Sequence, residues 1–310
     1  MEMKIIEKGV LSSDKTHTLK GKLYIPSGEI KGYFQVVHGM TEHIGRYDEF
    51  LKEIASNGYL AFAFDNLGHG YTAKDISELG YIAKKDGYKL LSQDVAVFYN
   101  AVREEYGDYP YYLMGHSMGS FIVRYSALED VSPQKLIVMG TGGKNPLAGI
   151  GLFVIKLLKL FKGDRHVSKF MDKMAFGSYN KIFRSEGSRR SWLTSDVSVR
   201  EKYDKDEFCN YRFTLSAMQD LITLNKEVNS AKWYKIFPKK LPVLLVSGGA
   251  DPVGNYGKGV NEVNQLLGKN GCNCRAKVYE GMRHEILNEP KVKKEVVSDI
   301  LNFIKDNGNL

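Results

Sequence analysis

The amino-acid sequence predicts an α/β fold with a mostly parallel central sheet, helices on both faces and a helical insertion. The first observation is that short apolar runs closed by glycine alternate with amphipathic stretches of helical length. The second is that this alternation stops between residues 145 and 238, in a basic segment without a strong strand pattern. The third is that strands resume after this segment, which predicts an insertion within one domain.

The first 143 residues supply most of the predicted elements. Short runs rich in Val, Ile, Tyr and Phe predict strands, whereas apolar residues spaced three and four apart predict helices. The predicted strands cover 4–13, 16–26, 32–39, 59–66, 111–117 and 135–143. The predicted helices cover 43–58, 90–107 and 118–130, and the first two close at glycine. Strands joined through helices of this length pair in parallel, with helices on both faces.

The remaining residues complete the same sheet on the far side of the insertion. The predicted strands cover 241–254 and 275–285, and the predicted helices cover 256–268 and 289–306. We therefore predict a core made of residues 1–144 and 239–310, with residues 145–238 inserted as a helical unit.

The net charge is unevenly distributed. Residues 144–240 hold 20 Lys and Arg against 10 Asp and Glu, whereas the remainder holds 24 against 26. No helix-turn-helix, zinc-finger or aromatic RNA-binding signature accompanies this excess, so we expect no nucleic-acid partner. Three cysteines without a C-x-x-C pair indicate a reducing cytoplasm. The amino terminus lacks the pattern of a secretory leader, and no apolar run reaches the roughly 18 residues of a membrane span.

The stretch YYLMGHSMGS, residues 111–120, places one serine between two glycines directly after an apolar run. Gly115, Ser117 and Gly119 fit the G-x-S-x-G nucleophile elbow, in which a serine stands at a strained strand-to-helix turn. Bulky side chains two residues away would not fit such a turn. The pentapeptide alone also fits a glycine-rich turn with an incidental serine, so the rest of the chain decides.

A serine nucleophile needs a base, and the base needs an orienting carboxylate. In the order serine, acid, histidine, His284 is the only histidine beyond residue 166, and it follows a predicted strand. Asp251 follows the apolar run VLLVSGGA, at a strand end where catalytic groups gather in open α/β sheets. Its alternative role is that of a turn residue. The competing acids Asp196 and Asp220 fall in the insertion, away from any predicted strand end.

The oxyanion of an acyl-transfer intermediate needs backbone N–H donors. We predict one from Met118, the residue after the nucleophile, and the other from Met40 in HGMTEH after the third strand. Metal binding is a weak alternative, because the candidate ligands His38, His43, His69 and His116 are scattered over different strand ends. We expect neither a metal nor a cofactor.

With these residues in place, the chain resembles the α/β-hydrolases of the monoacylglycerol lipase and lysophospholipase-like group, which is sometimes classed with serine aminopeptidases. HGMTEHIGRY resembles that group's HGxxEHxxRY segment, DNLGHG its DxxGHG strand end and GHSMGS its GHSMGG elbow. GGADPVG and RHEILNE are similar to its acid and histidine segments, and the insertion corresponds to its cap. Two departures are Thr41, where a small residue is usual, and Tyr71-Thr72, where Arg-Ser often follows.

The resemblance implies a serine hydrolase that cleaves carboxylic esters, of monoacylglycerol or lysophospholipid type, through Ser117, His284 and Asp251 and an acyl-enzyme. Other hydrolases on the same fold, such as a peptidase or a C–C hydrolase, and a non-catalytic lipid-binding protein are the alternatives. A basic cap disfavours a peptidase that must hold a free amino terminus.

Residues 145–165 combine many Leu, Ile and Phe residues with Lys156, Lys159 and Lys162. On a helix, these lysines leave a broad apolar face. That face either packs on the core or lies in a lipid interface with the lysines at its rim. The predicted partners are therefore a small acyl ester and the surface of an anionic lipid layer, which a cytoplasmic protein would meet peripherally at the inner membrane surface.

Overall fold

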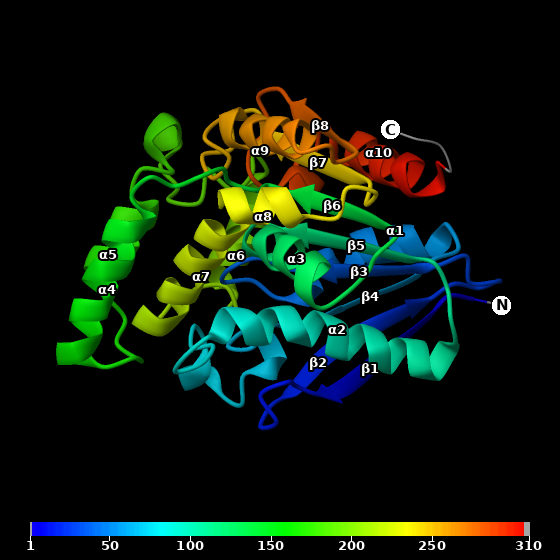
Figure 1. Cartoon of the computed structure of the whole chain (residues 1–310), viewed down its shortest axis with the longest axis horizontal. Helices are drawn as coiled ribbons and strands as arrows, with labels where there is room; N and C mark the ends of the chain where they lie inside the picture. The colour runs from blue at the N-terminus through cyan, green and yellow to red at the C-terminus, as the bar shows by residue number, and fades with distance from the viewer. Residues whose placement is uncertain (1, 307–310) are drawn as a thin grey trace.

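The computed structural model describes residues 2–306 and contains an eight-stranded sheet in the order β1-β2-β4-β3-β5-β6-β7-β8 (Figure 1). The strands are β1 (Lys4–Leu11), β2 (Thr18–Ile25), β3 (Tyr33–Val37), β4 (Leu60–Phe64), β5 (Tyr111–His116), β6 (Lys135–Met139), β7 (Val243–Gly248) and β8 (Cys274–Tyr279). β2 pairs antiparallel with both of its neighbours, and the other neighbouring strands pair in parallel. The predicted mostly parallel sheet is confirmed.

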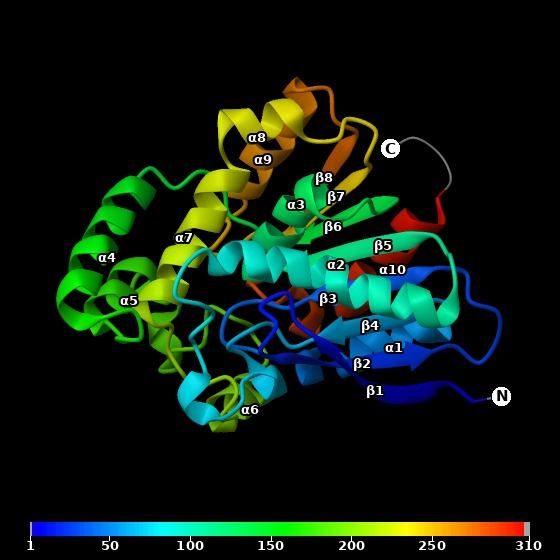
Figure 2. The ribbon, with the colours of Figure 1, turned by 60° about the horizontal axis from the view of Figure 1, so that its bottom comes forward.

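Helices cover both faces of this sheet (Figures 1 and 2). The α-helices are α1 (Asp48–Ser56), α2 (Gly87–Tyr106), α3 (Met118–Glu129), α4 (Ala148–Lys162), α5 (Lys169–Phe176), α6 (Val197–Lys205), α7 (Leu215–Val228), α8 (Ala231–Ile236), α9 (Lys258–Lys269) and α10 (Lys293–Lys305). Buried residues of α2, α3, α7, α8 and α9 form one apolar core, and those of α1 and α10 form the other. The strands β3, β4, β5 and β7 are buried at every position, as expected between two helical layers.

Several predicted strands extend too far at their carboxyl ends. The predicted runs 32–39, 59–66 and 135–143 end as strands at Val37, Phe64 and Met139. The residues beyond these ends are glycines and polar residues that leave the ladder and form loops along one edge of the sheet. This edge is where the candidate site residues lie.

Residues 145–238, all of which the structure describes, contain helices and no strand. In both ribbon views α4 and α5 lie beyond α7, away from the sheet (Figures 1 and 2). In contrast, α7 packs against α2 and α3. We propose residues 145–238 as the cap, with α4 and α5 as its outer part. Within residues 2–306, no helix has both the length and the hydropathy that crossing a bilayer requires.

Asp220, one of the acids rejected as a catalytic candidate, has a structural role. It lies on α7, is 5% exposed and accepts hydrogen bonds from the backbone N–H groups of Gly87 and Tyr88. It therefore caps the amino terminus of α2 from another helix, where the end of the helix would otherwise leave these donors unpaired. Burial outweighs these hydrogen bonds and raises the pKa of Asp220 to about 7.

The raised pKa of Asp220 predicts a pH-dependent contribution to stability. The folded state holds this proton more tightly than the unfolded state, so the stabilisation is fully present below about pH 4 and is lost as the pH rises through about 7. Asp220→Asn should remove this contribution, at most about 4 kcal/mol, and flatten the pH dependence of the unfolding free energy. Urea unfolding at several pH values measures this pH dependence, and the control is Glu129→Gln, which replaces an exposed carboxyl group. If the unfolding free energy of Asp220→Asn changed with pH as steeply as that of the wild type, this assignment would be contradicted.

Candidate active site

Ser117 occupies a turn that only glycine-flanked sequences can form. It lies between β5 and α3 with φ of 54° and ψ of −120°, an unfavourable conformation for a residue with a side chain. A Cβ on Gly115 would lie 2.2 Å from the backbone oxygen of Gly119, and a Cβ on Gly119 would lie 2.1 Å from that of Val37. The G-x-S-x-G spacing is therefore a steric requirement of this turn.

His284 and Asp251 follow neighbouring parallel strands, β8 and β7, at the same edge of the sheet. Nδ1 of His284 lies 2.9 Å from Oδ2 of Asp251 and donates to this oxygen. Both residues are buried, and the second carboxylate oxygen accepts the backbone N–H of Val253 at 2.8 Å. This arrangement places the ring proton of His284 on Nδ1 and leaves Nε2 able to accept a proton.

The candidate oxyanion donors lie beside the serine. Met40 and Met118 line the same cavity as Ser117 and His284. Among the hydrogen bonds within residues 2–306, neither amide donates to a protein acceptor. A Cβ built on Gly39 would lie 2.9 Å from Cβ of Ser117, so the loop after β3 approaches the serine closely. Two free N–H groups next to one hydroxyl fit the needs of an oxyanion site.

A buried ion cluster joins the loop after β3 to the loop that carries His284. Arg46 donates to Oε2 of Glu42 at 2.8 Å and makes a two-point contact with Glu285, at 2.8 and 2.7 Å. Burial alone would raise the pKa of both carboxyl groups, but His116 and Arg46 hold that of Glu42 well below its usual range. Arg46 likewise lowers the pKa of Glu285. Both carboxylates therefore stay ionised around one guanidinium.

His116, the residue before Ser117, belongs to the same cluster. Its Nδ1 lies 3.0 Å from the hydroxyl of Tyr47 and 3.3 Å from Oε1 of Glu42, and its Nε2 lies 3.3 Å from the backbone oxygen of His284. Burial would lower the pKa of His116, but the hydrogen bond and charge of Glu42 outweigh it and raise this pKa. A protonated ring can donate to acceptors on both sides and so connect the elbow to the His284 loop.

Sequence reasoning missed Glu42, Arg46, His116 and Glu285. Isolated charged residues are normally exposed, so composition gave no reason to bury them. The available signal was their position, because Glu42 and Arg46 stand within HGMTEHIGRY and Glu285 directly follows His284.

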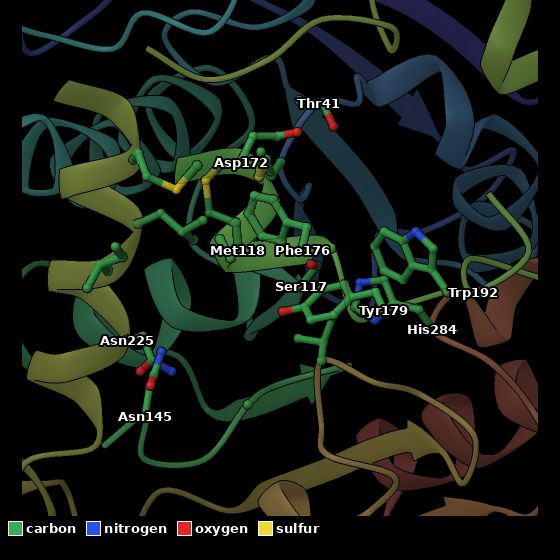
Figure 3. A pocket seen from close by; sticks show the side chains of 18 of the residues that line it. Thr41, Ser117, Met118, Asn145, Asp172, Phe176, Tyr179, Trp192, Asn225 and His284 are labelled. Atoms are coloured by element: carbon green, nitrogen blue, oxygen red, sulfur yellow. The ribbon is translucent and has the colours of Figure 1, made fainter. Parts of the chain in front are cut away.

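A cavity of about 870 Å³ opens in front of Ser117 (Figure 3). Figure 3 shows Ser117 and His284 in one part of its wall and Asn145 and Asn225 in another. Much of the remaining wall is apolar and comes from the cap, including Leu147, Met171, Met174, Phe176, Met218, Leu221 and Ile222. The cavity has the size and lining of a small-molecule binding site.

His43, Asp206 and Cys209 are the described residues that come closest to a metal-binding group, with their ligand atoms within 4.8 Å of one another. Nδ1 of His43 accepts the N–H of Gly45, so its proton lies on Nε2 and is donated to Asp206 at 2.8 Å. A cation at Nε2 would have to displace this proton while Nδ1 still faces a donor. The group is therefore arranged as a hydrogen-bonded contact between cap and core.

The fold and this site define the class of protein. Three features are those of an α/β-hydrolase: the sheet, the glycine-flanked serine after β5, and the contact of His284 with Asp251 at the ends of β8 and β7. The sequence model of the family described as serine aminopeptidase, S33, matches residues 28–291. The chain belongs to this family, as the motifs predicted.

Several known proteins with similarity to this chain are esterases and lipases. The crystal structure of a highly thermostable carboxyl esterase from Bacillus coagulans in complex with glycerol superposes with a TM-score of 0.92, is 30% identical and covers 98% of both chains. A monoglyceride lipase homolog of Monkeypox virus is 23% identical and covers 91% of this chain and 92% of its own. A monoacylglycerol lipase of Mycolicibacterium smegmatis is 23% identical over 91% of both chains.

The ion cluster predicts a large effect of removing its cation. Arg46→Met would leave two buried carboxylates facing each other, so the unfolding free energy should fall by about 3–5 kcal/mol. Arg103→Met breaks the exposed pair with Asp108 and should cost less than about 1 kcal/mol. Urea unfolding of the two variants at pH 7 gives both values. Equal stability of Arg46→Met and the wild type would show that the cluster does not hold the two loops.

Proposed function

We propose that this protein is a serine hydrolase that cleaves carboxylic esters of monoacylglycerol or lysophospholipid type through Ser117, His284, Asp251 and an acyl-enzyme. The observation that carries the proposal is the 2.9 Å contact between His284 and Asp251 beside a serine in the elbow conformation. The enzyme class, a carboxylic ester hydrolase, is confirmed by the family and by the esterase and lipase relatives.

In the proposed reaction, Oγ of Ser117 attacks the ester carbonyl and its proton passes to Nε2 of His284. Asp251 stabilises the imidazolium that forms, and the amides of Met40 and Met118 donate to the oxyanion. The tetrahedral intermediate collapses as His284 returns the proton to the leaving alcohol. Water then attacks the acyl-enzyme with His284 as base, which releases the carboxylic acid and restores Ser117.

The cavity wall supports an acyl substrate better than a peptide. Three of its four acidic residues are paired with arginines, because Glu42 and Glu285 contact Arg46 and Asp172 contacts Arg212. Only Glu262 in this wall remains for holding a free amino terminus. In contrast, the apolar side chains from α4, α5 and α7 offer the surface that an acyl chain would bury.

The nucleophile is tested by Ser117→Ala. The variant should lose ester hydrolysis by about 10⁴- to 10⁶-fold in kcat, because the remaining groups have no oxygen to activate. Hydrolysis of p-nitrophenyl butyrate and labelling by a fluorophosphonate report the loss. Ser126→Ala is the control: it lies on α3, the helix that follows Ser117, its hydroxyl donates to the backbone oxygen of Ser92, and the variant should keep its rate and its labelling. Near wild-type turnover of Ser117→Ala would refute the assignment.

The outer part of the cap exposes a group of large apolar side chains. Their exposed fractions range from 50% for Met174 to 84% for Phe161, and the others on or next to α4 and α5 in this range are Leu147, Ile150, Phe153, Leu160 and Phe170. We propose that this surface lies on anionic lipid, at the inner face of the membrane in a cytoplasmic setting, since apolar side chains rimmed by lysines suit that interface. The alternative, that this apolar face packs on the core, applies to only part of α4, because Ile155 is buried whereas Phe153, Leu160 and Phe161 are exposed.

The three lysines of the predicted rim are not equivalent. Lys156 and Lys162 are exposed, but Lys159 contacts Asp164 at 2.8 Å and Gln219 at 3.0 Å. Lys159 therefore holds α4 against α7 and contributes little free charge to the rim.

Lipid docking predicts a charge-dependent affinity. Each lysine near an anionic surface contributes about 1 kcal/mol, so replacing Lys156 and Lys162 with Gln should weaken binding to phosphatidylserine-containing vesicles by roughly 30-fold. Sedimentation with vesicles measures the partition at two salt concentrations. The matched control replaces the exposed Lys232 and Lys235 of α8, which lies away from α4 in both ribbon views (Figures 1 and 2). Equal losses in the two variants, or a wild type that does not sediment, would contradict the docking.

A further inference from the structure

Thr41 has a backbone conformation that does not suit its side chain. Its φ is 52°, in the left-handed region that favours glycine. Among residues 2–306, the other non-glycine residues with positive φ are Lys15, Asp86, Ser117, Asn255 and Tyr256, so Thr41 is the only β-branched one. A β-branched residue in this region is strained, and such strain persists only where the surroundings enforce it.

Tyr203 of the cap helix α6 contacts both the backbone oxygen and the side chain of Thr41. Its hydroxyl donates to the backbone oxygen of Thr41 at 2.6 Å. Since the phenol has one hydrogen, its oxygen then accepts from Oγ1 of Thr41 at 2.8 Å. Tyr203 is 5% exposed, and the guanidinium groups of Arg46 and Arg190 lie 4.8 and 4.6 Å from its ring centroid. The ring is thus held in place while its hydroxyl holds Thr41.

The strained residue directly follows Met40, the proposed oxyanion donor. On the other side of Met40, the backbone N–H of Gly39 donates to Oε1 of Glu42 at 2.5 Å. The Met40 amide therefore lies between two anchored residues, one held by the buried ion cluster and the other by the cap. If the second anchor is removed, Thr41 can relax toward negative φ, and this rotation turns the neighbouring peptide groups.

We propose that Tyr203 is a positioning residue that holds the Met40 amide in the orientation that binds the oxyanion. The inference rests on the proposed function and extends it, because it makes α6 a part of the catalytic arrangement. Asp206, at the end of the same helix, makes a second contact with this loop through His43. The position of the cap on this side thereby determines whether the oxyanion site is complete.

The first test is Tyr203→Phe, which keeps the ring and removes both hydrogen bonds. The value of kcat for p-nitrophenyl butyrate should fall roughly 5- to 30-fold, the factor that corresponds to the strain of one such residue. KM should change less than about twofold, since the oxyanion donors act mainly in the transition state. The control is Tyr111→Phe. Tyr111 is the first residue of β5, at the end of the strand away from Ser117, and its buried hydroxyl donates to Gln35. The kcat of this variant should remain at the wild-type value.

The second test is rescue. Glycine adopts positive φ without strain, so Thr41→Gly in the Tyr203→Phe background should restore kcat to within about threefold of the wild type. A residue that only stabilised the cap would not be rescued in this way. Thr41→Val keeps the strain and removes one hydrogen bond, and it provides a milder probe if Tyr203→Phe does not fold. It should lower kcat about 2- to 5-fold.

The outcomes separate this inference from the proposed function. If the wild type does not hydrolyse the ester, or Ser117→Ala remains active, the proposed function fails. If the wild type is active but a folded Tyr203→Phe keeps its kcat, Tyr203 has no positioning role. A fall in kcat that Thr41→Gly does not rescue would also overturn the inference, because the effect would then not pass through Thr41. An unchanged kcat for Thr41→Val would overturn it as well.

Discussion

The contact of Arg46 with Glu42 and Glu285 is the interaction on which the site depends. Two carboxylates from loops 243 positions apart in the sequence share one buried guanidinium. Removing these charges from water is costly, so the cluster contributes less to stability than to geometry. Because Glu42 also accepts the N–H of Gly39 and Glu285 follows His284, the loop of the proposed oxyanion donor and the loop of the proposed base are held at a fixed separation.

The sheet supplies the frame within which this cluster acts. The parallel strands β3, β5, β7 and β8 end at one edge, and each is followed by a residue of the candidate site. Burial of these strands on both faces leaves little room for them to shift against one another. The strained turn at Ser117 is therefore supported by a rigid core, as strain at a functional position requires.

Local patterns in the sequence predicted the order of strands and helices and the residues that the site brings together. Glycine-closed apolar runs and the elbow spacing are local signals, and Ser117, Asp251 and His284 follow from them with the hydrolase order. The predicted ends of the strands were less accurate. The glycines and polar residues at 38–39 and 140–143 directly follow the apolar runs, and nothing in the sequence marks that they do not join the sheet. Tyr203 was not predictable as a partner of the oxyanion loop, since 162 positions separate it from Thr41.

The cap is attached asymmetrically, and this asymmetry separates the two tasks that we propose for it. Near His284, the backbone oxygens of Trp192 and Leu193 accept the N–H groups of His284 and Glu285, and Arg283 is paired with Glu186. Together with the contact of Tyr203 with Thr41, these contacts fix the side of the cap that faces the candidate site. On the other side, α4 and α5 present large apolar side chains to solvent and are joined to the rest by few polar contacts such as that of Lys159. Under the proposed function, one side of the cap would maintain the geometry of the reaction while the other side meets the lipid that supplies the substrate.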